Sequence, residues 1–235
     1  MEIFIRDFRV GDFPLITGIL TDRDYRQTEK DLLNSVDILE LRVDMFASTA
    51  PANVRKTFME VRELFNKPVI ATVRATGEGG EKEVPNRLDL YRSIIPLSDV
   101  TDVEINADSL FKEVRKLCTT FKKVLIGSYH NFDETPGAAA LERIVKKGFD
   151  SGANLVKIAL KANSRSDLLD LLSFALEKRS SRLIIISMGD KGLPSRILAP
   201  VIGSPISYGY INTPSAPGQF SVVEMLSMFR KLKMR

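Results

Sequence analysis

The feature that most constrains the fold is a regular alternation of short apolar runs with longer polar or amphipathic stretches. Eight runs have the character of buried strands, and each is followed by a stretch of helical character. Alternation at this spacing is typical of parallel βαβ units. Eight units predict an α/β fold, a (β/α)8 TIM barrel, whose usual length of about 250 residues is close to the 235 residues present.

Residues 1–10 lie before this alternation and predict a short strand or hairpin that closes one end of the barrel. The stretch 21–34, after the first strand, is expected to be helical. No change of composition marks a linker, so residues 1–235 are predicted to form a single domain. An open doubly wound sheet is the alternative, and it requires that the weakest strand signals, at 13–20 and 206–210, are loops.

Charge and cysteine content narrow the function classes. Lysine and arginine number 34 against 30 acidic residues, and the charges are interspersed, which argues against a nucleic-acid-binding surface. A single cysteine, Cys118, excludes an intrachain disulfide and fits a reducing, cytoplasmic setting. A single histidine excludes a histidine-rich zinc site, while magnesium held by carboxylates stays open. No signal-peptide pattern is evident, and no apolar run approaches the roughly 20 residues of a membrane helix.

The apolar run 154–160 carries Lys157 in the middle of a predicted buried strand. Burying an ammonium group without a partner is costly, so such a position favours the neutral amine. A neutral lysine amine is a nucleophile that forms Schiff bases with carbonyl substrates. The alternative is that Lys157 lies at the strand's end and reaches water. From this run alone both interpretations stay open.

Charged residues recur at the carboxyl ends of other predicted strands, where a barrel places its active site. Glu40, Arg42 and Asp44 share one face of the second strand. They fit a substrate contact or an internal ion-pair network equally well. Arg74 ends the third strand, before a glycine-rich loop that lacks the lysine and the spacing of a P-loop.

The single histidine, His130, follows the fifth predicted strand in the same loop region. Imidazole is the natural general acid and base near neutral pH. One helix and one strand separate His130 from Lys157, which places both at the same end of the barrel on adjacent strands. Arg196 follows the seventh strand, and its guanidinium suits a carboxylate. The loop 214–219 presents polar side chains to the same region or is an ordinary surface turn.

Six short motifs lie at successive strand ends. They are Glu-x-Arg-x-Asp from Glu40, Thr-x-Arg-(x)3-Glu-Gly-Gly-Glu from Thr72, Ser-Tyr-His-x-Phe-x-x-Thr-Pro from Ser128, Lys-Ile-Ala from Lys157, Ser-Met-Gly-(x)2-Gly-(x)2-Ser-Arg from Ser187 and Ser-Ala-Pro-Gly-Gln from Ser215. Most are unspecific singly. As an ordered series over about residues 13–235, they closely resemble those of type I 3-dehydroquinate dehydratases.

The resemblance implies a lyase of the shikimate pathway of aromatic amino acid biosynthesis, which converts 3-dehydroquinate to 3-dehydroshikimate and water. Lys157 would form a Schiff base with the substrate ketone, and His130 would act as general acid and base. Glu78 matches the carboxylate that orients this histidine in the family. The resemblance implies no metal or organic cofactor, and because family members are commonly dimers we expect a homodimer.

The resemblance also implies a group of substrate-binding residues. Arg196 would hold the substrate carboxylate, and the remaining contacts would come from Glu40, Arg42, Arg74, Met188, Tyr208, Ser215, Ala216 and Gln219. Tyr208 stands where relatives carry a phenylalanine, and Ile186 where they often carry a second methionine. No contact from the first strand is assigned.

Two other functions are compatible with part of this pattern. A class I aldolase-like barrel also uses a lysine on strand six, but it usually needs a phosphate site after strands seven and eight. The single histidine at strand five and a donor group of carboxylate size favour the dehydratase. A binding or regulatory barrel without activity is the other alternative, and the presence of Lys157, His130, Glu78 and Arg196 argues against it.

Overall fold

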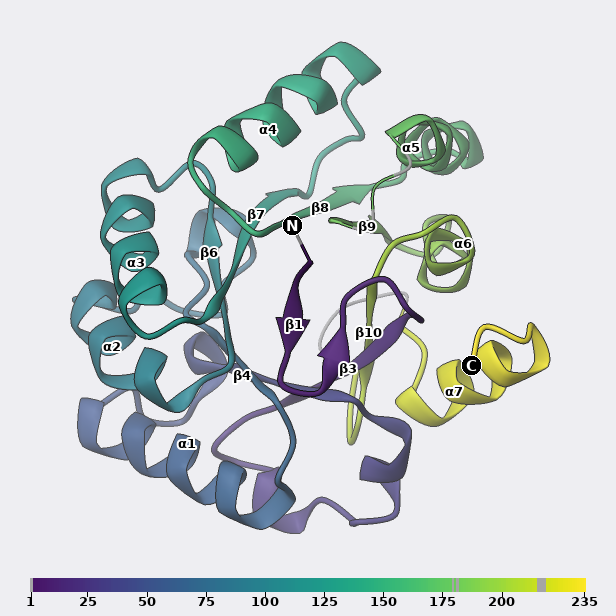
Figure 1. Cartoon of the computed structure of the whole chain (residues 1–235). Coiled ribbons are helices and arrows are strands. Elements are labelled where there is room, and N and C mark those ends of the chain that lie inside the picture. The colour runs from purple at the N-terminus through teal and green to yellow at the C-terminus, as the bar shows by residue number, and fades with distance from the viewer. Residues whose placement is uncertain (1, 179, 181, 215–218) are drawn as a thin grey trace.

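The chain forms a nearly closed barrel of eight parallel strands, with helices packed around its outside (Figure 1). The computed structural model describes residues 2–178, 180, 182–214 and 219–235. The strands pair in the order β10-β3-β4-β5-β6-β7-β8-β9. The predicted (β/α)8 barrel is confirmed. The open sheet is excluded, because the strands at its two weakest signals pair with each other, with Ile206 opposite Leu15.

The strands and helices alternate along the chain from residue 15 onward. The barrel strands are β3 (Leu15–Leu20), β4 (Ile38–Arg42), β5 (Val69–Thr72), β6 (Val100–Glu104), β7 (Val124–Asn131), β8 (Leu155–Lys161), β9 (Leu183–Met188) and β10 (Ile206–Tyr210). The helices are α1 (Pro51–Phe65), α2 (Arg87–Ile94), α3 (Asp108–Thr120), α4 (Ala138–Asp150), α5 (Arg165–Lys178), α6 (Ser195–Val201) and α7 (Val222–Lys231). Among the described residues, none of these helices has the length and apolar character that a membrane crossing requires.

The first βα unit departs from the prediction. The stretch 21–34 is not an α-helix; it holds two short 3-10 turns, Tyr25–Gln27 and Leu32–Ser35. The carboxylate of Asp24 accepts hydrogen bonds from the backbone N–H and the hydroxyl of Thr21, at 2.8 and 3.1 Å. Such local side-chain bonds compete with helical ones, which explains why a polar stretch of suitable length does not form a helix here.

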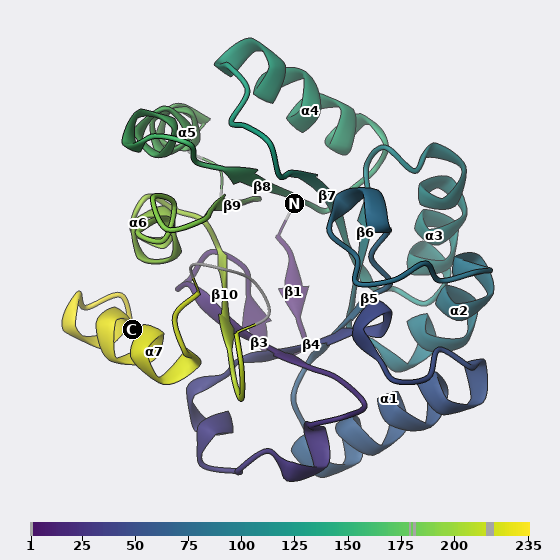
Figure 2. The same cartoon turned by 180° about the vertical axis from the view of Figure 1, so that it is seen from behind.

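A short hairpin covers the amino-terminal end of the barrel, as predicted (Figure 1). Its strands are β1 (Phe4–Ile5) and β2 (Phe8–Arg9). Ile5 is fully buried against the aliphatic residues inside the barrel. At the turn, the guanidinium of Arg6 pairs with Asp99 at 3.1 Å and so ties the hairpin to the strand ends. Viewed from the opposite end, the hairpin lies behind the strands and leaves the carboxyl ends free (Figure 2).

The residues that point into the barrel change character along each strand. The first inward positions are all aliphatic and buried: Leu15, Ile38, Ile70, Val100, Ile126, Leu155, Ile184 and Ile206. Two residues further on, nearly all positions carry a polar group: Thr17, Glu40, Thr72, Asp102, Ser128, Lys157, Ile186 and Tyr208. The amino-terminal half of the interior is therefore an ordinary core, and the half towards the carboxyl ends is polar.

The barrel has a seam between β9 and β10, which share no backbone ladder among the described residues. Serine hydroxyls replace that ladder. Ser204 Oγ accepts the backbone N–H of Ile185 at 3.1 Å, and Ser195 Oγ accepts that of Ser187 at 2.9 Å. Ser207 Oγ donates to the carbonyl of Arg196, on α6, at 2.8 Å. Helix α6 thus bridges the two strands and closes the ring through side chains.

Candidate active site

A cavity of about 210 Å³ opens at the carboxyl ends of the strands, and every predicted site residue that the structure describes lines it. Ser215 and Ala216 lie outside the described residues. The lining comprises Ile19, Glu40, Arg42, Arg74, Glu78, Gly79, His130, Phe132, Lys157, Ala159, Ile186, Met188, Arg196, Tyr208 and Gln219. The barrel therefore gathers residues that are far apart in the sequence into one site.

Lys157 occupies the second inward position of β8 and is 4% exposed, so it does not lie at the strand's end in water. Its Nζ lies 2.6 Å from Oδ2 of Asp102 and 4.7 Å from the centre of the Tyr208 ring. Sequence reasoning missed Asp102. The signal was present, since Asp102 and Glu104 alternate with apolar residues on β6 as the charges do on β4.

An alternating row of charges crosses the barrel beneath the cavity. Arg74 donates from Nη2 to Asp102 at 2.7 Å and from Nη1 to Glu104 at 3.0 Å and to Ser128 Oγ at 2.7 Å. Arg87 binds the other oxygen of Glu104. Burial alone would raise the pKa of Asp102, but the charges of Arg74 and Lys157 outweigh it and hold that pKa well below its usual range. Asp102 is therefore a fixed negative charge.

His130 and Glu78 form a hydrogen-bonded pair at the rim. Glu78 Oε2 lies 3.0 Å from both Nδ1 and the backbone nitrogen of His130. Burial and the charges of Arg74 and Lys157 lower the pKa of His130 well below its usual value, so the ring is neutral at pH 7. Burial and repulsion from Glu104 raise the pKa of Glu78 to about 7. With Nδ1 engaged by Glu78, the other ring nitrogen is left for chemistry.

The sequence left two roles open for the charges at the end of β4: an internal ion-pair network and substrate contact. Arg42 makes a bidentate ion pair with Asp44, at 2.9 and 2.7 Å, and donates to the carbonyl of Gly79 at 3.2 Å. Glu40 accepts a hydrogen bond from the hydroxyl of Thr72 at 2.7 Å. Arg42 and Glu40 also line the cavity. The ion-pair network and a position suited to substrate contact therefore coexist.

Arg196 is a buried cation with no ion pair among the described residues, and it is 4% exposed. Among the described residues its side chain makes one long hydrogen bond, from Nη1 to the carbonyl of Tyr208 at 3.4 Å, and Nε has no partner there. Burial lowers the pKa of Arg196 from its usual value to about 10. An uncompensated guanidinium at a cavity wall is a strong site for a carboxylate.

Ile19 and Phe132 are among the lining residues that were not assigned to the site from the sequence. Ile19 is the contribution of the first barrel strand. Phe132 stacks beside the His130 ring, with centroids 6.5 Å apart and planes 14° from parallel. The same ring covers Gly79, where an added Cβ would lie 2.3 Å from it and where φ is +86°. Phe132 belongs to one of the motifs quoted above, but its packing on Gly79 depends on the tertiary fold.

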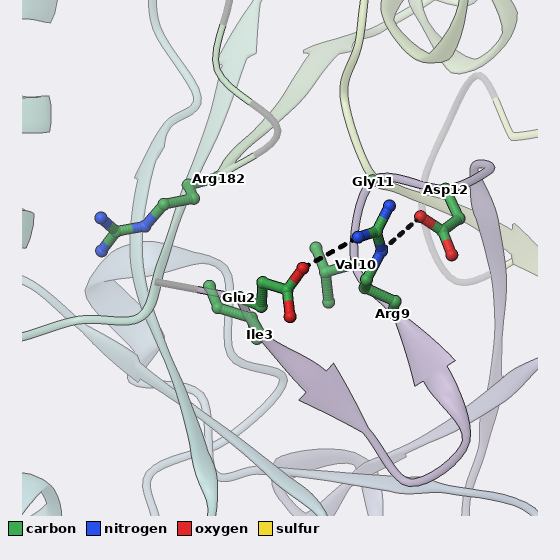
Figure 3. Close-up of a pocket in the computed structure, with 7 residues that line it drawn as sticks. All are labelled: Glu2, Ile3, Arg9, Val10, Gly11, Asp12 and Arg182. Carbon is green, nitrogen blue, oxygen red and sulfur yellow. Dashed lines mark hydrogen bonds and ion pairs between the residues drawn. The ribbon is translucent and has the colours of Figure 1, made fainter.

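Another cavity, of about 280 Å³, lies at the hairpin end of the barrel (Figure 3). Arg9 crosses it and pairs with Glu2 at 2.9 Å and with Asp12 at 2.6 Å. Arg182, on its far side, donates to the carbonyls of Asn154 and Ala153 at 2.9 and 3.2 Å. Arg9, Glu2 and Asp12 thus pair with one another, Arg182 is bound by backbone carbonyls, and the catalytic candidates are all at the other end.

Comparisons with known proteins agree with the motif series. The model of the type I 3-dehydroquinase family matches residues 19–235. The 3-dehydroquinate dehydratase of Thermodesulfovibrio yellowstonii is 38% identical over 224 residues, covering 95% of this chain and 98% of that protein. The crystal structure of the Aquifex aeolicus enzyme is 36% identical, covers 92% and 98% of the two chains and superposes with a TM-score of 0.85. That of the Clostridium difficile enzyme, described with covalently modified comenic acid, is 28% identical, covers 99% and 97%, and gives 0.91.

Proposed function

The chain belongs to the type I 3-dehydroquinase family, and we propose that it converts 3-dehydroquinate to 3-dehydroshikimate and water through a Schiff base on Lys157. One observation carries the mechanism. A buried lysine, a neutral imidazole and a guanidinium that has no ion pair among the described residues line the same small cavity. These groups supply a nucleophile, a general acid and base, and an anchor for a carboxylate.

The first half of the reaction forms an electron sink. Lys157, paired with Asp102 in the structure, first gives up a proton, and its amine then attacks the substrate ketone; the resulting carbinolamine loses its hydroxyl as water to give a protonated imine. His130 moves the protons that this exchange requires. The positive nitrogen then acidifies the neighbouring carbon. When His130 removes a proton from that carbon, the electron pair moves into the new carbon–carbon double bond of an enamine.

The second half expels the hydroxyl group. The nitrogen lone pair re-forms the carbon–nitrogen double bond, and the electrons of the enamine double bond form a new double bond to the carbon that carries the hydroxyl. The carbon–oxygen bond of that carbon breaks, and protonated His130 gives its proton to the departing hydroxyl, which leaves as water. Hydrolysis of the conjugated imine then releases 3-dehydroshikimate and restores Lys157. Glu78 supports both proton transfers of His130, from the substrate carbon and to the departing hydroxyl. Its carboxylate, 3.0 Å from Nδ1, keeps the ring proton on that nitrogen and leaves the other ring nitrogen to exchange protons.

The remaining residues orient the substrate. Arg196 binds the substrate carboxylate. The argument for this role is that its buried guanidinium makes no ion pair with any residue that the structure describes. The other contacts that we assign to the substrate are Glu40, Arg42, Arg74, Met188, Tyr208, Ser215, Ala216 and Gln219. Arg74 also fixes the carboxylates of Asp102 and Glu104, since its guanidinium donates hydrogen bonds to both.

Trapping of the imine tests the proposal. We expect incubation with 3-dehydroquinate and borohydride to add the mass of the reduced ligand to the peptide that contains Lys157. Lys157→Ala should give no adduct and no turnover. His130→Ala should still form the adduct, but more slowly because water must then carry the protons of imine formation, while turnover falls at least about 100-fold. Turnover by the Lys157→Ala variant would exclude the covalent mechanism. An adduct formed only with a phosphosugar would instead identify an aldolase-like enzyme.

We also propose that residues 1–235 act as one catalytic unit in the cytoplasm, as a homodimer. The single, buried cysteine is consistent with a reducing compartment. Sedimentation equilibrium at micromolar protein concentration tests the oligomeric state, and a mass equal to the 26.3 kDa of one chain would contradict the dimer.

A further inference from the structure

The geometry points to a role for Asp102 that the assigned machinery does not include: Asp102 is the counter-ion that keeps the imine nitrogen of Lys157 positively charged while the substrate is dehydrated. This inference rests on the proposed Schiff-base mechanism. It adds a residue that touches the reacting nitrogen directly, since Oδ2 of Asp102 lies 2.6 Å from Nζ.

The position of the Asp102 carboxylate is fixed from its other oxygen. Oδ1 accepts hydrogen bonds from Ser128 Oγ at 2.6 Å and from Arg74 Nη2 at 2.7 Å. The side chain is fully buried. Oδ2 thus has the lysine nitrogen as its partner, and a buried carboxylate held in this way cannot turn to water when Lys157 reacts.

A role as the proton acceptor of the amine does not fit Asp102. Arg74 stabilises the negative charge of its carboxylate, so the carboxyl group is a poor base at neutral pH. When the ammonium becomes an amine, the proton must pass to another group, and neutral His130 is the available one. Asp102 keeps its negative charge throughout the cycle and acts by electrostatics alone.

That charge is most useful after the imine forms. The ammonium has three N–H bonds, and the protonated imine has one, with the positive charge spread onto the former ketone carbon. A carboxylate 2.6 Å from the nitrogen accepts this remaining N–H and disfavours its loss. The Tyr208 ring, 4.7 Å from the nitrogen, adds attraction for the cation. Since only the protonated imine draws electrons from the neighbouring carbon, Asp102 holds the sink in its active form.

Titratable groups face this pair from every neighbouring element, so a pH-dependent test must account for them. They are Glu40 and Arg42 on β4, Arg74 at the end of β5, Glu78 in the loop that follows, Glu104 on β6, His130 on β7, Arg196 on α6 and Tyr208 on β10. Only Asp102 among the carboxylates is within ion-pair distance of Lys157 in the described part of the chain.

The test compares Asp102→Asn with the unaltered enzyme. Without the carboxylate, the amine should lose its proton more easily, and the pH for half-maximal adduct formation with 3-dehydroquinate and borohydride should fall by about 1–2 units. The imine should then be poorly protonated, and kcat should fall about 100- to 1,000-fold. An unchanged pH midpoint, or a kcat within about twofold of the original, would overturn the proposal. A purely structural role would lower kcat without moving the midpoint.

Glu104→Gln is the matched control. It removes a buried carboxylate from the same Arg74 but none from Lys157. We expect its midpoint to move by less than half of the Asp102→Asn shift, and an equal shift would assign the effect to net charge and overturn the proposal. If Asp102→Asn does not fold, Ser128→Ala replaces it. Without the Ser128 hydroxyl, the carboxylate of Asp102 attracts the Lys157 ammonium more strongly. The pH midpoint should therefore rise by about half a unit. A fall or no change in the midpoint would contradict the counter-ion role.

Failure of the Schiff-base mechanism is distinguishable from failure of this inference. If the unaltered enzyme forms no adduct on Lys157, the proposed function is wrong. If it forms the adduct and Asp102→Asn retains the pH profile, the function stands and the counter-ion role is wrong.

Discussion

In the proposed mechanism, the protonation state of the Glu78–His130 pair decides whether the site is active. With Glu78 ionised, Nδ1 of His130 carries the proton and donates to Oε2 at 3.0 Å, which leaves the other ring nitrogen free as a base. When Glu78 is protonated, its O–H donates to Nδ1 instead, and the proton moves to the nitrogen that should act as base. Uptake of one further proton by this pair therefore switches the general base off.

We expect kcat/KM to fall as the pH drops through about 7, because the pKa of Glu78 is raised to about 7 and its acidic form is inactive. His130 does not cause this decline, since its own pKa lies well below. In Glu78→Gln the decline near pH 7 should disappear, with activity lowered at least about tenfold at every pH. Glu83→Gln, which changes an exposed carboxylate on the same loop, should keep the profile. The same decline in Glu78→Gln would refute the assignment.

We expect Arg196 to lower the stability of the protein while it serves substrate binding. Burial of its charge without a counter-ion costs free energy in the empty enzyme, as the lowered pKa of about 10 indicates. We expect Arg196→Leu to raise the free energy of unfolding by about 1–3 kcal/mol and to lower kcat/KM by more than about 100-fold. Urea denaturation and initial rates measure the two effects.

The exposed Arg143, on α4, provides the control for this variant. Arg143→Leu should change both quantities little, with the unfolding free energy within about 0.5 kcal/mol of the original. A destabilised Arg196→Leu enzyme would show that the guanidinium finds partners within the protein, and the carboxylate assignment would lose its main support.

The motifs and the alternation of inward and outward residues along each strand predicted most of the residues that line the cavity. They did not predict residues whose importance depends on partners from other strands. Lys157, His130, Glu78 and Arg196 meet in one cavity, as the order of the motifs implied. Asp102 did not stand out, because its importance depends on the register that sets β6 against β5 and β7. A carboxylate on a buried strand is a signal by itself, and its partner is known only from the fold.

At the scale of elements, the hairpin β1–β2 closes the end of the barrel at which the interior is aliphatic. Ile3 and Ile5 complete the ring of first inward residues, and Arg6 pairs with Asp99 outside it. The alternation of apolar residues in 1–10 predicted this element. The prediction of a helix over 21–34 was wrong. Hydrogen bonds from Thr21 to the carboxylate of Asp24 replace helical ones, and the stretch has no periodic apolar face that would favour a helix.

We expect Ile5→Ala to destabilise the protein by about 2–5 kcal/mol, because it opens a cavity in a fully buried core position. The neighbouring Phe4, 52% exposed, is the control, and Phe4→Ala should cost less than about 1 kcal/mol. Both variants should keep kcat/KM within about twofold, since the hairpin and the cavity lie at opposite ends. Urea unfolding checks the first expectation, and a large loss of activity in folded Ile5→Ala would contradict the separation of the two ends.

At the scale of the whole molecule, the seam between β9 and β10 distinguishes this barrel from a continuous ring. The closure through Ser195, Ser204 and Ser207 was not predictable, because serine next to a predicted strand is common and the bonds cross from helix to strand. Strand order and count, by contrast, followed from the alternation of apolar runs with helical stretches.

Ser204→Ala should cost about 1–3 kcal/mol, since it leaves the buried N–H of Ile185 without a partner. Hydrogen exchange at the Ile185 amide should accelerate more than at amides in the middle of the β7–β8 ladder. Ser93→Ala, whose hydroxyl bonds only a carbonyl of its own helix, should cost less than about 1 kcal/mol. Equal exchange at all these amides would show that the serine does not close the ring.

The seam leaves the closure of the ring to one helix. Helix α6 contacts both β9 and β10, and it carries Arg196. Lys157 lies on β8, which pairs with β9 on one side of the seam. The residue proposed to anchor the substrate carboxylate therefore belongs to the element that holds the two edges of the sheet together, so closure of the barrel and the position of Arg196 relative to Lys157 depend on the same contacts.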